Sequence, residues 1–347
     1  MEKEHEYMRL CFELAELGKG SVAPNPLVGA VLVKNGRIIG KGYHRSYGEG
    51  HAEVEAIESV HDKTDVSGST LYVNLEPCVH HGNTPPCCDR IIQEGIAKVV
   101  IAEIDPNQKV KGKGVERLRN SGLEVKTGVL SKDEILLNKR FRTFHEKKRP
   151  YIILKWAESQ DGFMDIERSG GEKGQFMISN AATQSVLHKW RSEEDAIMIG
   201  TNTAVNDDPS LTVRLIKGKN PSRFIIDLND RLPDTLKMFR DGFPVTVYSG
   251  NRDGTFGTRE YVRIKNRLNL LEEIMNDMYL RQVQSVLIEG GSILLKSFIE
   301  IGLWDEIRVF KGNGLIKNGI KAPEVGSSPI STEVIGDNEL LLFRKSQ

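Results

Sequence analysis

Residues 75–87 read LEPCVHHGNTPPC and hold two prolyl-cysteine pairs, whose cysteines are Cys78 and Cys87. The tripeptide His51-Ala52-Glu53 precedes this stretch in the chain. Zinc prefers thiolate and imidazole ligands in tetrahedral geometry, and a catalytic zinc uses three protein ligands and leaves the fourth position for water. The residues therefore predict a catalytic zinc site formed by His51, Cys78 and Cys87.

Glu53 follows the histidine by two positions and is predicted to carry protons. A bound zinc lowers the pKa of water to about 7, which makes a nucleophile available to attack an amino-bearing ring carbon at neutral pH. A carboxylate must then move protons to the ring and to the leaving ammonia. In zinc deaminases the glutamate that does this is not a ligand. Both ligand segments are expected to open helices, whose positive ends favour thiolates.

The remaining cysteines and histidines leave other interpretations open. A structural zinc site normally has four protein ligands, and Cys88 is a candidate fourth. Adjacent cysteines rarely chelate one ion well, so we expect Cys88 to be a buried bystander. Cys11 lies on the apolar stripe of a predicted helix and is expected in the core. His80 is expected to contact a substrate rather than the metal.

Composition favours a small-molecule enzyme. The 48 basic residues balance the 48 acidic ones, whereas a nucleic-acid binder usually carries a basic excess. We therefore expect no nucleic-acid partner. The first residues, MEKEHEYMRL, lack the apolar segment of a signal peptide, and no stretch approaches a membrane span. A cytoplasmic location without membrane association is expected.

The order of predicted elements indicates two α/β domains. A helix over 2–18 is followed by a hairpin around Asn35-Gly36, a strong two-residue turn signal. The charged stretch HEKKRP at 145–150 is typical of a domain boundary, which gives domains over 1–147 and 148–347. In the first domain we predict further helices at 52–60, 89–95 and 114–121 and strands at 70–75 and 98–104. In the second we predict strands at 151–157, 195–200, 223–227, 244–248, 285–288 and 306–310, and helices at 181–191 and 293–301.

The motifs resemble those of the bifunctional riboflavin-biosynthesis deaminase/reductase family. The run APNPLVGAV at 23–31 joins the zinc motifs, and the eight-residue gap between Cys78 and Cys87 differs from the Cys-x-x-Cys pair of cytidine and tRNA-adenosine deaminases. The resemblance continues through KWAESQDG at 155–162, DDPSLTVR at 207–214 and EGG at 289–291, and so covers nearly the whole chain. It departs from the family at Gln160, commonly leucine, and at Met177, commonly tryptophan.

The resemblance implies a cytidine-deaminase-like three-layer α/β/α domain followed by a dihydrofolate-reductase-like α/β domain, with Zn²⁺ and NADPH as cofactors. It implies deamination of 2,5-diamino-6-(ribosylamino)-4(3H)-pyrimidinone 5'-phosphate, then reduction of the ribosyl group to ribityl. Since such reductase domains often pair, a homo-oligomer, either a dimer or a tetramer, is expected. The expected substrate contacts are Asn25, His44, His80, Gln175, Arg191, Leu211, Arg214 and Glu289. The expected NADPH contacts are Ala157, Met177, Ser179, Thr203, Asp207, Gly290, Gly291 and Ser292.

Without the resemblance, the residues of the second half indicate a function less specifically than those of the first. Glu289-Gly290-Gly291-Ser292 lies between a predicted strand and a predicted helix, where backbone amides can approach a phosphate. No GxGxxG motif occurs, so a Rossmann domain is not supported. Lys155 and Asp207 are the candidates for a general acid. A deaminase with a non-functional reductase domain, a nucleic-acid or nucleoside deaminase, and a zinc-stabilised binding protein remain as alternatives.

Overall fold

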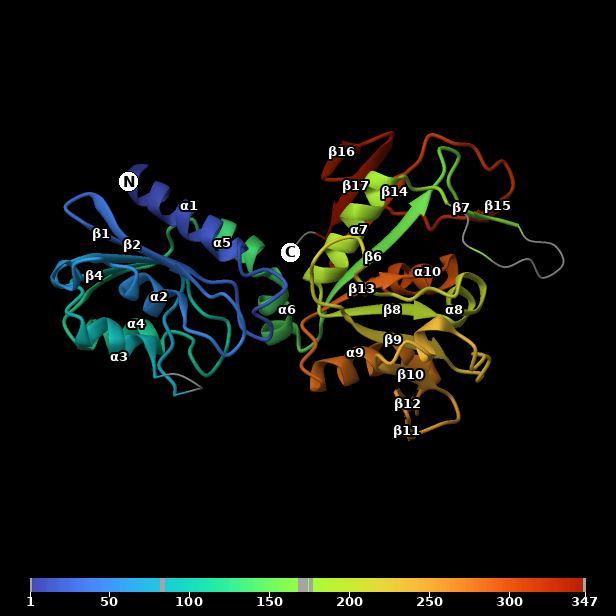
Figure 1. Cartoon of the computed structure of the whole chain (residues 1–347), viewed down its shortest axis with the longest axis horizontal. Coiled ribbons are helices and arrows are strands. Elements are labelled where there is room, and N and C mark those ends of the chain that lie inside the picture. The colour runs from blue at the N-terminus through green and yellow to red at the C-terminus, as the bar shows by residue number, and fades with distance from the viewer. Residues whose placement is uncertain (1, 82–84, 168–173, 175–176, 346–347) are drawn as a thin grey trace. The chain divides into compact units, whose positions relative to one another are not determined.

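The protein divides into two compact units, Met1–Lys148 and Arg149–Gln347. The structure is a computed structural model that describes residues 2–81, 85–167, 174 and 177–345. Each unit has its own β-sheet with helices beside it, as Figure 1 shows. Among the described residues, no helix is both long enough and apolar enough to cross a membrane.

A five-stranded sheet with the order β2-β1-β3-β4-β5 forms the middle of the first unit (Figure 1). Its strands are β1 Gly29–Lys34, β2 Arg37–Tyr43, β3 Thr70–Leu75, β4 Lys98–Glu103 and β5 Glu124–Lys126. Strand β1 runs antiparallel to β2 and β3, while β3, β4 and β5 are parallel. Asn35 and Gly36 join β1 to β2 with φ angles of 51° and 73°, the left-handed values that a type I′ hairpin requires. The predicted hairpin is therefore confirmed.

Helices cover both faces of this sheet. Met8 and Cys11 of α1 (Glu2–Glu16) pack with Val31 and Val100 on one face. Helices α2 (Ala52–Glu58), α3 (Cys87–Gln93) and α4 (Lys113–Asn120) contribute to a second core cluster on the other face. Helices α5 (Ser131–Leu137) and α6 (Lys139–Lys147) end the unit. The predicted three-layer α/β/α fold is confirmed.

The second unit contains a ten-stranded sheet with the order β11-β12-β10-β9-β8-β13-β6-β14-β17-β16. Seven neighbouring strands are parallel: β12 Arg259–Arg263, β10 Val245–Ser249, β9 Ser222–Asp227, β8 Ala196–Gly200, β13 Ser285–Glu289, β6 Tyr151–Glu158 and β14 Glu306–Lys311. The antiparallel strands at the edges are β11 Gly254–Phe256, β17 Asn338–Arg344 and β16 Ser331–Ile335. A separate ribbon pairs β7 Phe163–Ile166 with β15 Gly319–Lys321.

Helices also cover both faces of the second sheet. Helices α9 (Leu270–Leu280) and α10 (Ser292–Glu300) pack through apolar side chains on one face, while α7 (Ala181–Glu193) and α8 (Thr201–Asp207) contribute to cores on the other. The sheet is mainly parallel and its strands are buried, as the α/β prediction requires. Because parallel strands end at one edge of a sheet, the carboxyl ends of β8, β9 and β13 meet there, which is where such sheets bind ligands.

Candidate active sites

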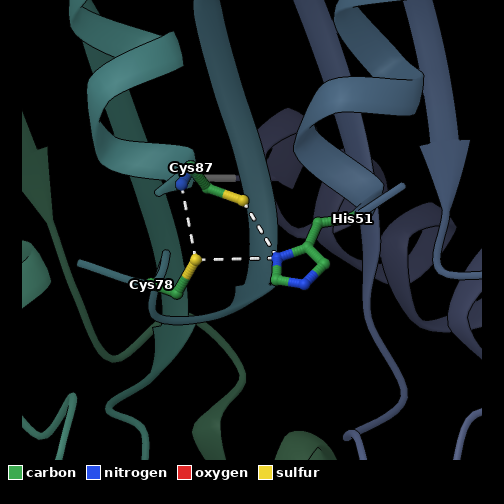
Figure 2. Close-up of side chains that lie close together, drawn as sticks. All are labelled: His51, Cys78 and Cys87. Carbon is green, nitrogen blue, oxygen red and sulfur yellow. Dashed lines mark hydrogen bonds between the residues drawn. The ribbon is translucent and has the colours of Figure 1, made fainter. Parts of the chain in front are cut away.

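The structure brings His51, Cys78 and Cys87 together from three segments of the first unit. His51 is the N-cap of α2, Cys87 is the first residue of α3, and Cys78 lies in the loop after β3. The nearest ligand atoms of the three residues all lie within 4.8 Å of one another. The Nδ1 atom of His51 is 3.1 Å from the sulfur of Cys87 and 3.6 Å from that of Cys78, as Figure 2 shows.

The chemistry of this donor set fits zinc. One imidazole and two thiols offer three soft or borderline ligands, which is the number that a catalytic zinc takes from its protein. The thiol of Cys78 has its pKa lowered to about 4, first by hydrogen bonding with Cys87 and then by His51, although burial opposes the shift. A metal binds the thiolate form of cysteine, so a low pKa at this position favours binding. Placement of both ligand segments at helix starts agrees with the expectation from the sequence.

Glu53 lies in the first turn of α2, beside the three donors. Its side chain is almost fully buried, with 4% exposed. Burial raises the pKa of its carboxyl, while the charge of His51 opposes that shift. Its carboxyl is also close enough to interact with the thiol of Cys87. Glu53 can therefore hold or release a proton next to the metal donors without contacting bulk water.

Asn25 and His44 form a hydrogen-bonded pair next to this cluster. The Nδ1 atom of His44 lies 3.0 Å from the carbonyl oxygen of Gly50, and its Nε2 atom lies 3.0 Å from Nδ2 of Asn25. Burial lowers the pKa of His44, which favours the neutral ring. A carbonyl only accepts, so Nδ1 carries the proton and Nε2 accepts from the Asn25 amide. The amide oxygen of Asn25 therefore remains oriented away from His44, where it can accept from a substrate.

The ring of His44 packs edge-on to that of His51, with 5.5 Å between ring centres, which places the Asn25–His44 pair at the metal cluster.

The remaining predicted substrate contact of the first unit is His80. His80 is exposed in the loop that follows Cys78. Residues 82–84 of the same loop lie outside the described part of the chain.

Cys88 faces away from the donor cluster. Its thiol donates to the carbonyl of Pro77 at 3.4 Å, and the side chain packs in the core among residues of α2 and α4. Burial raises the pKa of this thiol far above its ordinary value. A neutral thiol in an apolar environment is a poor ligand, so the structure agrees with the expectation that Cys88 is a bystander.

Three buried polar side chains that support this site had no role assigned from the sequence. Asn74 of β3 accepts from the N–H of Gly29 at 2.7 Å and donates to the carbonyl of Leu27 at 2.9 Å. Asn138, between α5 and α6, accepts from the N–H of Leu27 at 2.8 Å and donates to the same carbonyl at 2.9 Å. Both asparagines therefore fix the backbone two residues beyond Asn25.

Glu76 is the third supporting side chain and fixes the loop that carries Cys78. Its carboxylate accepts from the backbone N–H groups of Gly112 and Gly114, both at 2.8 Å, and also from those of Asp105 and Val115. Gly114 has to be glycine, because an added Cβ would collide with the carbonyl of Pro77. The only sequence signals for these roles were an asparagine in a buried strand and a glutamate directly before Pro77.

Two cavities lie at the carboxyl edge of the second sheet and meet each other. The smaller, of about 300 Å³, is lined by side chains that include Lys155, Arg191 and Arg214. The larger, of about 740 Å³, extends past the start of α10 toward the end of β9. Both cavities are lined by Met164, Asp165, Thr203, Asp207 and Gly290, so they are continuous at these residues.

A buried ion pair forms the base of the smaller cavity. The Nε and Nη2 atoms of Arg191 each donate to one carboxylate oxygen of Glu289 at 2.8 Å. Burial alone would raise the pKa of Glu289, but the charge and hydrogen bonds of Arg191 hold that pKa below its ordinary value. Burial lowers the pKa of the neighbouring Lys155, and Glu289 opposes this shift. A basic side chain with a lowered pKa at a cavity is a candidate for proton transfer.

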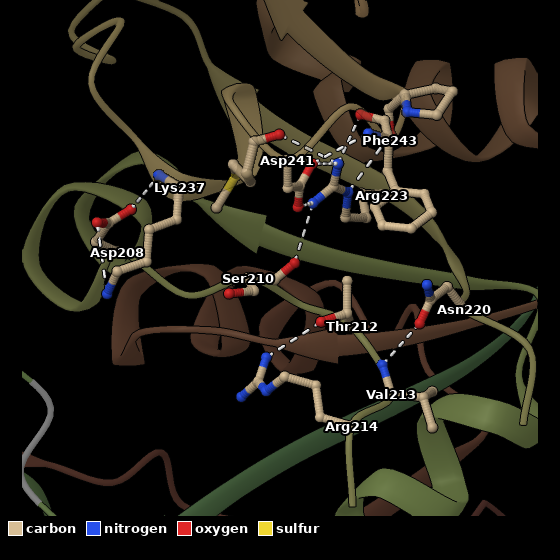
Figure 3. Close-up of polar contacts among 12 residues, drawn as sticks. Asp208, Ser210, Thr212, Val213, Arg214, Asn220, Arg223, Lys237, Asp241 and Phe243 are labelled. Carbon is tan, nitrogen blue, oxygen red and sulfur yellow. Dashed lines mark hydrogen bonds and ion pairs between the residues drawn. The ribbon is translucent and has the colours of Figure 1, made fainter. Parts of the chain in front are cut away.

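The segment from Asp208 to Arg214 contributes Asp208, Pro209, Ser210, Leu211 and Arg214 to the lining of the smaller cavity. Figure 3 shows polar contacts of this segment. Leu211 adopts a φ of 57°, an uncommon value for a residue with a branched side chain, so the surrounding structure must hold it there. The buried Arg223 does so, since it donates to the carbonyl of Ser210 at 3.1 Å and pairs with Asp241 at 2.6 Å. No sequence motif predicts this role of Arg223. Arg214 lies at the rim and donates to the hydroxyl of Thr212 at 3.2 Å.

Most of the predicted NADPH contacts line these cavities. The larger one is lined by Gly291 and Ser292, which open α10, and the hydroxyl of Thr203 accepts from the N–H of Gly291 at 2.9 Å. Ala157 and Ser179 line the smaller one, as do the predicted substrate contacts Arg191, Leu211, Arg214 and Glu289. Met177 is 54% exposed and is not among the described residues that line either cavity. Gln175 lies outside the described residues.

Known proteins resemble both units. A family model for the cytidine and deoxycytidylate deaminase zinc-binding region matches residues 1–103, and one for the RibD C-terminal domain matches residues 150–316. The riboflavin biosynthesis protein RibD of Aquifex aeolicus is 36% identical, over 99% of this chain and 99% of the relative. RibD of Escherichia coli is 35% identical, over 89% of this chain and 87% of the relative.

Solved structures of full-length relatives are also similar. A diaminohydroxyphosphoribosylaminopyrimidine deaminase/5-amino-6-(5-phosphoribosylamino)uracil reductase from Thermotoga maritima gives a TM-score of 0.88 at 35% identity, with 99% of each chain covered. RibD of Acinetobacter baumannii gives a TM-score of 0.88 at 30% identity, with 100% of this chain and 99% of the relative covered. The similarity therefore extends over both units in one chain.

Proposed function

The chain belongs to the RibD family of bifunctional riboflavin-biosynthesis enzymes, and from this premise we propose which residues perform its two reactions. It is a zinc-dependent deaminase and an NADPH-dependent reductase in one chain. We assign the deaminase to residues 1–147 and the reductase to residues 148–347. The proposed substrate is 2,5-diamino-6-(ribosylamino)-4(3H)-pyrimidinone 5'-phosphate, which loses ammonia first and has its ribosyl group reduced to ribityl second.

In the deaminase, His51, Cys78 and Cys87 would hold the zinc. The metal, when bound, supplies a water of lowered pKa, and thus a nucleophile at neutral pH. Glu53 would accept the two protons that the attacking water loses and would pass one to the ring nitrogen and the other to the departing amino group, so that ammonia leaves. The oxygen of Asn25 is oriented to accept from the pyrimidine, since His44 occupies its amide nitrogen. We also propose that His80, which is exposed in the loop after Cys78, contacts the substrate.

In the reductase, NADPH supplies a hydride, and the protein positions the two reactants. The junction of the two cavities is the place where cofactor and sugar can meet, so the nicotinamide is assigned to the region of Thr203, Asp207 and Gly290. The smaller cavity then receives the sugar phosphate. Arg214 at its rim offers the planar, charged donor that a phosphate prefers. Lys155 and Asp207 both line this cavity and are the candidates to donate the proton that the new hydroxyl needs.

The partners proposed for the enzyme follow from these sites. The substrate is a small molecule whose sugar phosphate occupies the smaller cavity, while NADPH occupies the larger one. A neutral net charge gives no basic excess for binding nucleic acid. We further propose a homo-oligomer and a cytoplasmic location. The four free cysteines suit a reducing compartment. A decayed reductase is not favoured, because the cavity and its Arg191–Glu289 pair are intact.

The position of buried Glu53, whose carboxyl interacts with His51, Cys78 and Cys87, is the observation that carries the deaminase assignment. Glu53→Gln keeps the shape of the side chain and removes its ability to move protons. We expect this variant to bind one zinc per chain and to release ammonia at least about a hundredfold more slowly. Its oxidation of NADPH with the deaminated substrate should be unchanged. Metal analysis and separate assays of ammonia and NADPH measure all three properties.

Glu55→Gln is the matched control, since Glu55 lies on the same helix and pairs with exposed Arg45. It should retain both activities. Ammonia release at the normal rate by Glu53→Gln would show that another group carries the protons, and loss of zinc from that variant would show a ligand or structural role instead.

A further inference from the structure

The larger cavity is lined by two arginines that the proposed chemistry does not use. It crosses the carboxyl ends of three neighbouring strands, with Gly290 after β13, Gly200 ending β8 and Leu228 after β9. Arg231 and Arg267 line it at the β9 side. The other side of the cavity, at Gly290, is where it joins the smaller cavity.

The inference rests on the proposed function, which determines how NADPH is oriented in this cavity. The nicotinamide must lie at the junction, because the hydride has to reach the sugar. The rest of the dinucleotide then extends along the larger cavity, past the start of α10 and toward β9. Two interstrand spacings, or roughly 10 Å, separate β13 from β9. The adenosine end of the cofactor therefore lies on the side of Arg231 and Arg267.

NADPH brings a pyrophosphate and a 2′-phosphate, and the cavity offers a different donor for each. At the start of α10 the N–H groups of Ser292, Ile293 and Leu294 precede the first intrahelical bond, which Leu295 makes to Gly291. Such a helix start suits the pyrophosphate. Among the described residues that line the cavity, the only cationic side chains are Arg231 and Arg267, whereas Asp165, Asp207, Glu272 and Glu300 are acidic. Within the described lining, these two arginines are the positive charges that a 2′-phosphate can meet.

Each arginine donates a hydrogen bond to an uncharged oxygen, so its positive charge can still interact with a bound phosphate. Arg267 donates to the carbonyl of Leu228 at 3.1 Å. It passes over Gly250, where an added Cβ would collide with the guanidinium. Arg231 donates to the side-chain oxygen of Asn202 at 2.7 Å. Neither arginine forms an ion pair within the part of the chain that the structure describes, so their remaining N–H donors and charges are uncompensated.

We propose that Arg231 and Arg267 bind the 2′-phosphate of NADPH and set the preference of the reductase for NADPH over NADH. The planar guanidinium group of arginine matches the geometry and charge of a phosphate monoester, and two such groups line this side of the cavity. NADH carries a hydroxyl at this position and gains nothing from the two charges. The arginines therefore discriminate between the coenzymes without contacting the nicotinamide, where the chemistry takes place.

The test compares the two coenzymes on full-length protein. NADPH and NADH are titrated into the wild type, Arg231→Ala, Arg267→Ala and the double variant, and binding is followed by the fluorescence of the reduced nicotinamide. Each single variant should bind NADPH about tenfold or more weakly, and the double variant weaker still. Binding of NADH should change less than about twofold, so the preference for NADPH collapses.

Arg263→Ala is the matched control, because Arg263 is an exposed arginine at the end of β12 that does not line the cavity. It should leave both affinities unchanged, and ammonia release should be normal in all variants. An unchanged NADPH affinity in the double variant, or an equal loss for NADPH and NADH, would overturn the inference while leaving the reductase assignment intact. A wild type that binds neither coenzyme would instead overturn the reductase function itself.

Discussion

Cys87 and Cys88 are neighbours in the chain and have opposite environments. Cys87 opens α3 with its sulfur 3.1 Å from His51, whereas the thiol of Cys88 donates to the carbonyl of Pro77 inside the core. Successive residues at a helix start point in directions about 100° apart, so only one of the two can face the metal donors. The pair therefore allows a matched test of the ligand set.

We expect Cys87→Ser and Cys88→Ser to differ in zinc content. The first change removes a thiolate ligand from a three-donor site, so the purified protein should hold much less than one zinc per chain and release no ammonia. The second leaves all three donors in place and should retain zinc, with a loss of stability of about 1 kcal/mol from placing a hydroxyl in the core. Metal analysis after gel filtration measures the difference. Equal zinc loss in both variants would contradict the assignment of Cys88 as a bystander.

Residues could be predicted where their function restricts residue type and spacing within the sequence, and could not be predicted where they act on distant segments. His51, Cys78 and Cys87 were recognisable because ligand chemistry restricts residue type and spacing, and the structure brings them together. Asn138 was not recognisable, since it acts on Leu27, which is 111 positions away in the chain. Arg223 was similar, because its partners Ser210 and Asp241 come from separate loops. Such contacts depend on tertiary packing and leave no pattern in one sequence.

At the scale of elements, the junction of α5 and α6 supports the deaminase site from outside the catalytic motifs. Asn138 stands between the two helices and makes two hydrogen bonds to the backbone of Leu27. Its amide nitrogen also donates to Glu134 of α5 at 2.8 Å, which fixes the orientation of the amide. Burial raises the pKa of Glu134 to about 8. The junction thus holds the segment that carries Asn25 against the metal cluster.

We expect Asn138→Ala to weaken substrate binding by the deaminase. The change leaves the N–H of Leu27 without its partner, at a cost of about 1–3 kcal/mol, and frees the segment that positions Asn25. The KM for deamination should rise about tenfold or more, with a smaller effect on kcat. Zinc content and NADPH oxidation should be unchanged. Steady-state kinetics of both half-reactions provide the measurement.

Asn120→Ala is the control for this change, because Asn120 is an exposed asparagine at the end of α4. It should leave the kinetics unaltered. An unchanged KM in Asn138→Ala would mean that Asn74 alone holds the segment, and a parallel loss of zinc would mean that the substitution damages the whole unit.

Most buried strands and several helices were predicted, whereas short elements, edge strands and the eleven-residue helix α9 were missed. The strand at 70–75 and the helix at 181–191 match β3 and most of α7. Strand β5 has three residues and α5 has seven, too few for a periodic pattern to emerge. Helix α9 and the edge strands β16 and β17 were also missed. The side chains of β16 are exposed at its three central residues and only partly buried at its two ends, so the strand has no alternating pattern.

At the scale of the whole molecule, two reactions are carried by two separately packed units. The zinc donors, Glu53 and the Asn25–His44 pair all belong to the first unit, and both cavities of the reductase belong to the second. Each hydrophobic core cluster among the described residues draws its members from one unit alone. The described residues therefore form two separate sets of stabilising contacts, and the metal-donor group found among them lies in the first.

Removal of zinc should consequently separate the two activities. Metal binding stabilises the folded unit that provides the ligands, so chelation with 1,10-phenanthroline should lower the melting temperature of the first unit and abolish ammonia release. The second unit has no ligand in the His51, Cys78 and Cys87 set, so NADPH oxidation with the deaminated substrate should persist. Calorimetry should show one transition that shifts and one that stays, and added zinc should restore the first activity. If both activities decline together as zinc is withdrawn, the units depend on each other for stability and the metal supports the whole chain.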